Sequence, residues 1–107
     1  MISEKKENHL YLKSDKNEPE SFDSISQSLF VSSDVILDLL SFEVLEDSFL
    51  SFLKQINLGI EAKGFCLVIV IKETPSLSDV ESLKVIPTLI EAEDYIQMEQ
   101  IQRDLGV

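Results

Sequence analysis

The sequence predicts a single α/β domain with a small, mostly parallel sheet and helices packed against it. Strand-like and helix-like segments alternate along the 107 residues, and such alternation produces layered domains whose parallel strands are joined by right-handed crossovers. Residues 65–71 (FCLVIVI) are continuously apolar and rich in β-branched side chains, which is typical of a strand buried on both faces. The length suits one domain, which we place at residues 9–107 after a flexible N-terminus of residues 1–8.

The first half of the chain contains two predicted strands with a helix between them. Residues 9–13 (HLYLK) alternate like a half-buried edge strand. From Ser21 onward apolar residues recur at helical spacing as far as Phe30, and the polar residues 32–34 end this helix. An apolar strand over residues 35–39 follows at once.

The second half contains the long helix, the central strand and a final strand–helix pair. The long helix begins near Glu46 or Asp47 and ends at Lys63-Gly64, where glycine suits the position after a helix. After the strand at 65–71, Ser78-x-x-Glu81 could cap one short helical turn, and residues 84–86 form the last strand. Thr88-x-x-Glu91 has capping-box spacing and opens the final helix, which ends at Gly106. Its predicted apolar stripe consists of Leu89, Ala92, Tyr95, Ile96, Met98, Ile101 and Leu105.

Composition argues against several classes of partner. The net charge of −11 disfavours nucleic acid and anionic membrane surfaces, because phosphate groups need a basic face. Residues 1–10 lack the apolar segment of a signal peptide, and no apolar run approaches the roughly 20 residues that cross a membrane. A single cysteine forbids an internal disulfide and fits a reducing compartment. We therefore expect a cytoplasmic protein without membrane insertion.

The sequence offers no recognisable catalytic or cofactor site. The single histidine, His9, excludes a multi-histidine metal site, and we expect it at the surface of the edge strand. Cys66 stands among apolar residues and is expected to be a buried structural side chain. No glycine-rich loop follows a strand, and acidic pairs such as Glu46-Asp47 are typical of solvated faces. We expect neither an enzyme nor a cofactor or metal.

The stretch from Val35 to Ile71 resembles the STAS domain, the fold of bacterial anti-sigma-factor antagonists. In that family a leucine–acid–leucine strand end precedes an Asp-Ser-Ser/Thr-Gly-Leu helix start, a long helix, a glycine and an apolar strand. Leu37-Asp38-Leu39 is similar to the strand end, and residues 46–53 (EDSFLSFL) to the helix start. Residues 86–92 (IPTLIEA) are similar to the family's final strand and helix start, so the resemblance covers roughly residues 35–100.

The resemblance implies a non-catalytic protein-interaction module of this type. It places Ser48 at the hydroxyl that a partner serine kinase phosphorylates, and Asp38 at the acid beside it. The sequence departs from the family where Glu46, Asp47 and Phe49 replace its aspartate, first serine and glycine. The family's second N-terminal strand is also missing between Lys13 and Ser21. Phe49 would put a bulky side chain where a kinase approaches, and the two acids would repel a phosphate.

These features give two hypotheses for function. In the first, an exposed rim docks onto another protein, for which the family suggests a kinase-like anti-sigma factor. Ser48 is the candidate phosphoacceptor, and the other partner-binding candidates are Asp38, Ser41, Glu46 and Asp47. In the second, the domain is a STAS-like regulatory or structural subunit of a transporter or enzyme complex without phosphorylation. A structural alternative for Ser48 is a serine that satisfies backbone amides of the helix start. Self-association could use the C-terminal helix.

Overall fold

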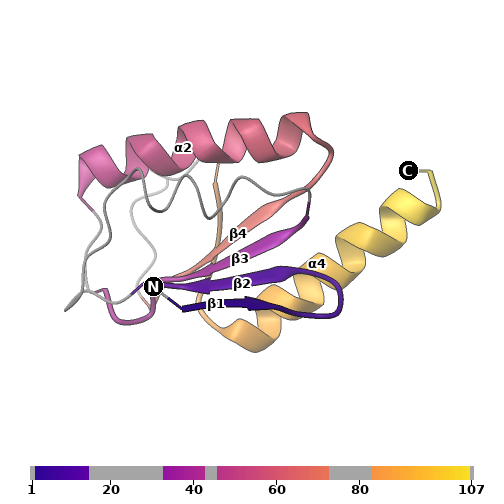
Figure 1. Cartoon of the computed structure of the whole chain (residues 1–107), viewed down its shortest axis with the longest axis horizontal. Helices are drawn as coiled ribbons and strands as arrows, with labels where there is room; N and C mark the ends of the chain where they lie inside the picture. The colour runs from indigo at the N-terminus through magenta and orange to yellow at the C-terminus, as the bar shows by residue number, and fades with distance from the viewer. Residues whose placement is uncertain (1, 15–32, 43–45, 73–82, 107) are drawn as a thin grey trace.

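One five-stranded sheet with a helix on each face forms the described part of the protein. A computed structural model describes residues 2–14, 33–42, 46–72 and 83–106. The strands follow the order β1-β2-β3-β4-β5 across the sheet (Figure 1), which confirms the predicted small α/β domain. The elements are β1 (Ile2–Lys5), β2 (Leu10–Lys13), β3 (Val35–Asp38), α2 (Asp47–Ala62), β4 (Leu67–Val70), β5 (Lys84–Ile86) and α4 (Leu89–Asp104).

The sheet is mixed, so the prediction of a mostly parallel sheet holds only in part. The pair β1–β2 is antiparallel, whereas β2–β3, β3–β4 and β4–β5 are parallel. The predicted unit around the long helix is confirmed. Val35 lies opposite Leu67 and Asp38 opposite Val70 in the β3–β4 pair, and α2 connects these strands across one face (Figure 1).

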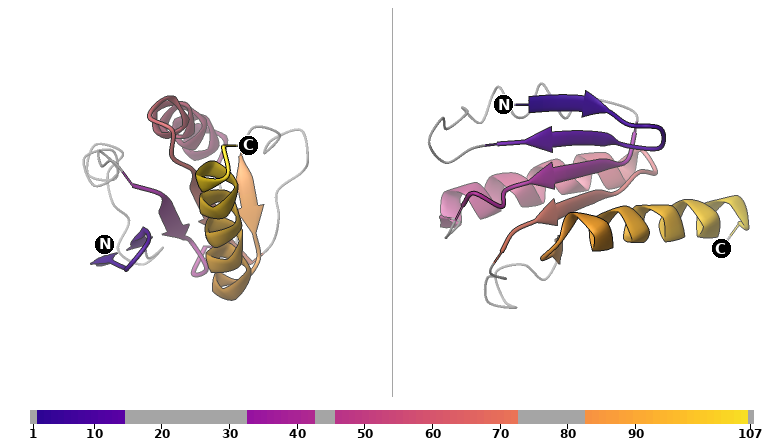
Figure 2. Two further views of the ribbon diagram at one scale, coloured as in Figure 1. Left: turned by 90° about the vertical axis from the view of Figure 1, so that its right-hand side faces the viewer. Right: turned by 90° about the horizontal axis from the view of Figure 1, so that it is seen from below.

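The two faces of the sheet carry separate apolar clusters. Side chains alternate between faces along a strand, so Leu37 and Ile69 point to the α2 side while Ile36 and Val68 point to the α4 side. All four are at most 1 % exposed. Figure 2 shows the sheet lying between the two helices. This double covering explains why residues 67–71 are apolar without alternation, as the sequence predicted.

The boundaries of α2 follow the predicted signals. Glu46 has extended backbone angles and occupies the N-cap position, and Lys63 is the C-cap. Gly64 follows with φ +86°, a left-handed conformation that glycine adopts without the steric cost of a Cβ atom. Leu50, Leu53 and Ile60 are buried against the sheet.

The final helix differs from its predicted apolar stripe. Its start is as expected, since the Thr88 hydroxyl accepts a hydrogen bond from the Glu91 amide at 3.2 Å. Only Ala92 and Ile96 of the stripe are fully buried, however, and Leu89 and Tyr95 are partly buried. Side chains three or four positions apart share a helix face, and Met98, Ile101 and Leu105 lie instead on the exposed side.

The N-terminal residues form a hairpin that the sequence pattern did not predict. We expected residues 1–8 to be a flexible segment, but Ile2–Lys5 form β1 beside β2, and the Lys6 amide donates to the His9 carbonyl across the turn at 2.8 Å. An edge strand is held by backbone pairing, so charged side chains do not prevent it from forming. The expectation that His9 lies at the surface is also wrong, since its side chain is only 6 % exposed. The predicted helix from Ser21 to Phe30 and the Ser78-x-x-Glu81 turn lie outside the described residues.

Candidate partner-docking surface

The start of α2 presents three consecutive polar residues at one end of the molecule. Glu46, Asp47 and Ser48 are all exposed, and we refer to residues 46–48 as the acidic edge. In Figure 1 this helix start lies at the same end of the fold as the carboxyl ends of β3 and β4. Side chains at such an end project from rigid elements, which suits recognition of another molecule.

Ser48 is the second residue of the helix rather than its cap. The N-cap Glu46 forms no side-chain cap hydrogen bond within the described chain, and its carbonyl accepts from the Leu50 amide at 3.0 Å. A serine satisfying backbone amides usually stands at the N-cap position itself. Ser48 is therefore an exposed residue of the first turn rather than the cap of the helix.

Asp38 is buried, in contrast to the exposed position expected for it. Its side chain is 3 % exposed, one carboxylate oxygen accepts from the Leu40 amide at 2.9 Å, and the other accepts from the Tyr11 hydroxyl. Burial and this hydrogen bond raise the pKa of Tyr11. Asp38 thus links the end of β3 to β2 and fixes the first turn of the loop that leads to the acidic edge.

Ser41 lies within that loop and is half-buried. Its hydroxyl donates to the Ser14 carbonyl at 3.4 Å, and the Phe42 amide donates to the Leu39 carbonyl at 2.9 Å. The first bond ties Ser41 to the residue after β2, and the second closes a turn over residues 39–42. The structure therefore places Asp38 and Ser41 in the interior or at its border, and only Glu46, Asp47 and Ser48 of the five candidates are exposed.

Phe49, the departure expected to obstruct a kinase, packs into the apolar cluster under α2. Its ring centroid lies 6.1 Å from those of both Phe42 and Phe52, the latter in an edge-on arrangement. The side chain is half-buried. Edge-on aromatic contacts of this kind stabilise a fold, so Phe49 anchors the helix start and leaves the serine beside it accessible.

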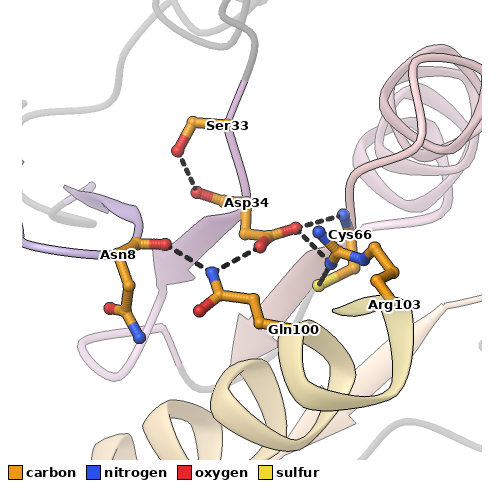
Figure 3. Close-up of polar contacts among 6 residues, drawn as sticks. All are labelled: Asn8, Ser33, Asp34, Cys66, Gln100 and Arg103. Atoms are coloured by element: carbon orange, nitrogen blue, oxygen red, sulfur yellow. Dashed lines mark hydrogen bonds and ion pairs between the residues drawn. The ribbon is translucent and has the colours of Figure 1, made fainter. Parts of the chain in front are cut away.

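A second polar cluster holds the C-terminal half of α4 on the sheet. Asp34 precedes β3, and its carboxylate accepts from Arg103 at 2.7 Å, from Gln100 at 2.7 Å and from the Cys66 amide at 2.9 Å (Figure 3). Gln100 also donates to the Asn8 carbonyl at 2.7 Å. We call this group the Asp34 cluster. It joins the β1–β2 turn, the starts of β3 and β4, and α4.

Burial and charge shift the titration of the Asp34 cluster. Burial raises the pKa of Asp34, but the hydrogen bonds from Arg103, Gln100 and the Cys66 amide outweigh it and lower the pKa of this carboxyl below its usual value. The hydrogen bond to Asp34 in turn raises the pKa of Arg103. An aspartate with a 1 % exposed side chain is therefore held ionised by its donors.

Cys66 was expected to be buried in the central strand, but it is half-buried and directly precedes β4. Burial, together with the adjacent Asp34 carboxylate, raises the pKa of its thiol to about 12. The thiol borders a cleft lined by Glu61, Lys84 and Tyr95. Because the thiolate is the nucleophilic form and the thiol stays protonated at neutral pH, Cys66 is a poor nucleophile there.

Sequence reasoning missed the Asp34 cluster because its members are far apart along the chain. Asp34 was assigned only to the end of a helix, and Gln100 was not singled out. One signal was available: Arg103 is the only arginine of the chain, and arginine is the cation best suited to a buried carboxylate. Its partner could not be identified without the fold.

No protein-family model matches the sequence, and a search of characterised proteins finds no match either. Neither helix in the described ranges combines the length and apolar character needed to cross a membrane. Within the same ranges, no three histidine, cysteine or acidic side chains gather in a way that could hold a metal ion.

Proposed function

We propose that this protein is a non-catalytic protein-interaction module of the anti-sigma-factor-antagonist type, which docks a partner through the acidic edge. The observation that carries the proposal is the exposure of Glu46, Asp47 and Ser48 on the first turn of a helix whose other side is buried. Nearby, Asp38 accepts a hydrogen bond from the Leu40 amide, and the Phe42 ring packs against Phe49 on this first turn. An exposed, charged helix start of this kind suits recognition of another molecule better than chemistry.

The partner in this proposal has a basic surface. The chain carries a net charge of −11, so a positive patch on the partner would accelerate encounter, and the effect would weaken at high salt. The resemblance to the STAS domain suggests a cytoplasmic, kinase-like anti-sigma factor. Ser41, on the loop before the acidic edge, would lie at the border of the contact.

Ser48 is the proposed point of regulation. A phosphate adds a charge of about −1.5 to −2 at neutral pH. Next to Glu46 and Asp47 this charge would raise repulsion within the acidic edge and alter its fit to the partner. Because the proposed partner surface is basic, the added charge would strengthen the attraction at low salt, so phosphorylation would act as a switch for docking.

The second candidate function is a regulatory or structural subunit of a transporter or enzyme complex without phosphorylation. It is favoured by Glu46 and Asp47, because these acids already supply at the helix start the negative charge that a phosphate would bring. Both versions use the same surface. They differ in the class of partner and in whether modification of Ser48 changes binding.

Capture of partners from native cells separates the two versions and tests the surface. The baits are the wild type, Asp47→Lys and, as a matched charge reversal, Glu7→Lys on the exposed β1–β2 turn. We expect a serine kinase or sigma regulator to be retained by the wild type and Glu7→Lys but lost by Asp47→Lys. A transporter or metabolic enzyme with the same pattern would support the second version. Equal retention by all three baits would exclude the acidic edge as the interface.

A further inference from the structure

The outer side of α4 carries an apolar stripe that the fold leaves uncovered. Ile90, Met98, Ile101 and Leu105 are 74 %, 59 %, 52 % and 73 % exposed. Met98, Ile101 and Leu105 are spaced by three and four positions, and Ile90 precedes Ile101 by about three turns, so all four lie on one side of the helix. They form most of the large exposed apolar side chains in the described chain, the other being Leu58 on α2.

The stripe belongs to a helix that is firmly held from its other side. Ala92 and Ile96 are completely buried against the sheet. Gln100 and Arg103 donate hydrogen bonds to the Asp34 carboxylate (Figure 3). Figures 1 and 2 show the last turns of α4 extending past the ends of the strands. The stripe is therefore presented on a pre-organised support about 22 Å long between Ile90 and Leu105.

The charges around the stripe define what could cover it. Five carboxylates and one arginine give α4 a net charge of −4, and the arginine is already paired with Asp34. Asp94, four positions before Met98, lies within the stripe and is exposed. An apolar surface interrupted and bordered by acids is complementary to a helix that carries apolar residues flanked by lysine or arginine.

We propose that the outer side of α4 is a second docking surface, which receives a basic amphipathic helix of a partner protein. Pairing two helices along such a stripe would bury the apolar side chains in ridges and grooves and place a basic residue opposite Asp94. A second copy of this chain fits poorly, because two α4 helices would oppose charges of −4 and −4 between molecules of net charge −11. This surface is distinct from the acidic edge and does not depend on its function.

A displayed library of amphipathic peptides of about 18 residues, some 27 Å long as helices, tests the proposal. Each peptide carries leucine at heptad spacing and lysine, glutamine or glutamate at the flanking positions. Selection uses the wild-type chain. We expect lysine to be enriched over glutamate at the flanking positions by about tenfold or more. No enrichment of any peptide, or equal recovery of lysine and glutamate, would overturn the proposal.

The selected peptides are then measured against two variants and in solution. The double variant Met98→Gln/Ile101→Gln should weaken binding by about tenfold or more, whereas Leu58→Gln, a matched change at the 64 % exposed Leu58 of α2, should leave it unchanged. Unaltered binding by the double variant would show that the peptides bind elsewhere. Sedimentation should find the wild-type chain monomeric, and a dimer lost in the double variant would assign the stripe to a second copy instead.

Discussion

Replacement of Arg103 by methionine tests whether the Asp34 cluster holds α4 on the sheet. The change keeps an unbranched apolar stem but removes the cation that lies 2.7 Å from the Asp34 carboxylate. Breaking a buried pair by removing one partner costs about 3–5 kcal/mol. Here the Arg103 side chain is 35 % exposed, and Gln100 and the Cys66 amide still donate to the carboxylate. We therefore expect a smaller loss, about 1–2 kcal/mol at neutral pH.

Urea unfolding at neutral pH measures this loss, with Lys6→Met as the matched control. Lys6 and Glu4 are also 2.7 Å apart, but both are largely exposed, so breaking their pair should leave stability unchanged within error. In a thermal melt, the Tm of Arg103→Met should fall by about 4–8 °C for each kcal/mol of lost stability in a domain of this size. Equal stability of Arg103→Met and Lys6→Met would refute the structural role of the Asp34 cluster.

The pH dependence supplies an independent check of the same cluster. Because the folded pKa of Asp34 lies below its usual value, the unfolded chain takes up this proton first on acidification. The contribution of the ionised Asp34 carboxylate to folding stability is complete above its unfolded pKa of about 3.9. It is lost as the pH falls through its folded pKa. The stability gap between wild type and Arg103→Met should therefore narrow in acid. A gap independent of pH would contradict the assignment.

Three further predictions concern single residues. Gly64→Ala should cost about 1 kcal/mol because of its φ of +86°. Gly59→Ala, in the interior of α2, should instead stabilise the fold by about 0.5–1 kcal/mol, because an added Cβ would meet no atom within 4 Å outside the adjacent backbone of its own helix. Urea unfolding of both variants checks the opposite signs. Cys66, with a thiol pKa of about 12, should react with a thiol reagent at pH 8 about a hundredfold or more slowly than in denaturant, and equal rates would contradict this. Burial lowers the pKa of His9, so stability should fall as the pH drops below about 6.5, and His9→Phe should remove part of that slope in unfolding measurements.

The sequence predicted best those elements whose signals are local or continuous. Residues 67–71 lack polar side chains because both faces of β4 are covered, and this is visible without the fold. The ends of α2 and the start of α4 follow from Gly64 and Thr88, whose conformations or hydrogen bonds involve only near neighbours.

The features that were missed depend on contacts between distant segments. β1 forms because β2 offers it a backbone partner, and its own residues have no apolar pattern. Buried Asp38 is hydrogen-bonded by Tyr11 on another strand. The Asp34 cluster depends on Gln100 and Arg103, which lie 66 and 69 positions after Asp34 in the sequence. Along α4, apolar residues occupy two opposite sides, so periodicity alone merged the buried Ile96 and the exposed Ile101 into one stripe.

The affinity of the captured partner for a small set of variants tests the central proposal most directly. The set comprises the wild type, Ser48→Ala, Ser48→Asp and Asp47→Lys, with Glu7→Lys as the control. If the acidic edge is the docking surface, Ser48→Ala and Glu7→Lys should bind like the wild type. Asp47→Lys should bind about tenfold or more weakly at low salt and lose much of its salt dependence, whereas Ser48→Asp, which adds a negative charge, should bind more tightly at low salt. Equal affinities for all five proteins, each shown to be folded, would contradict the proposal.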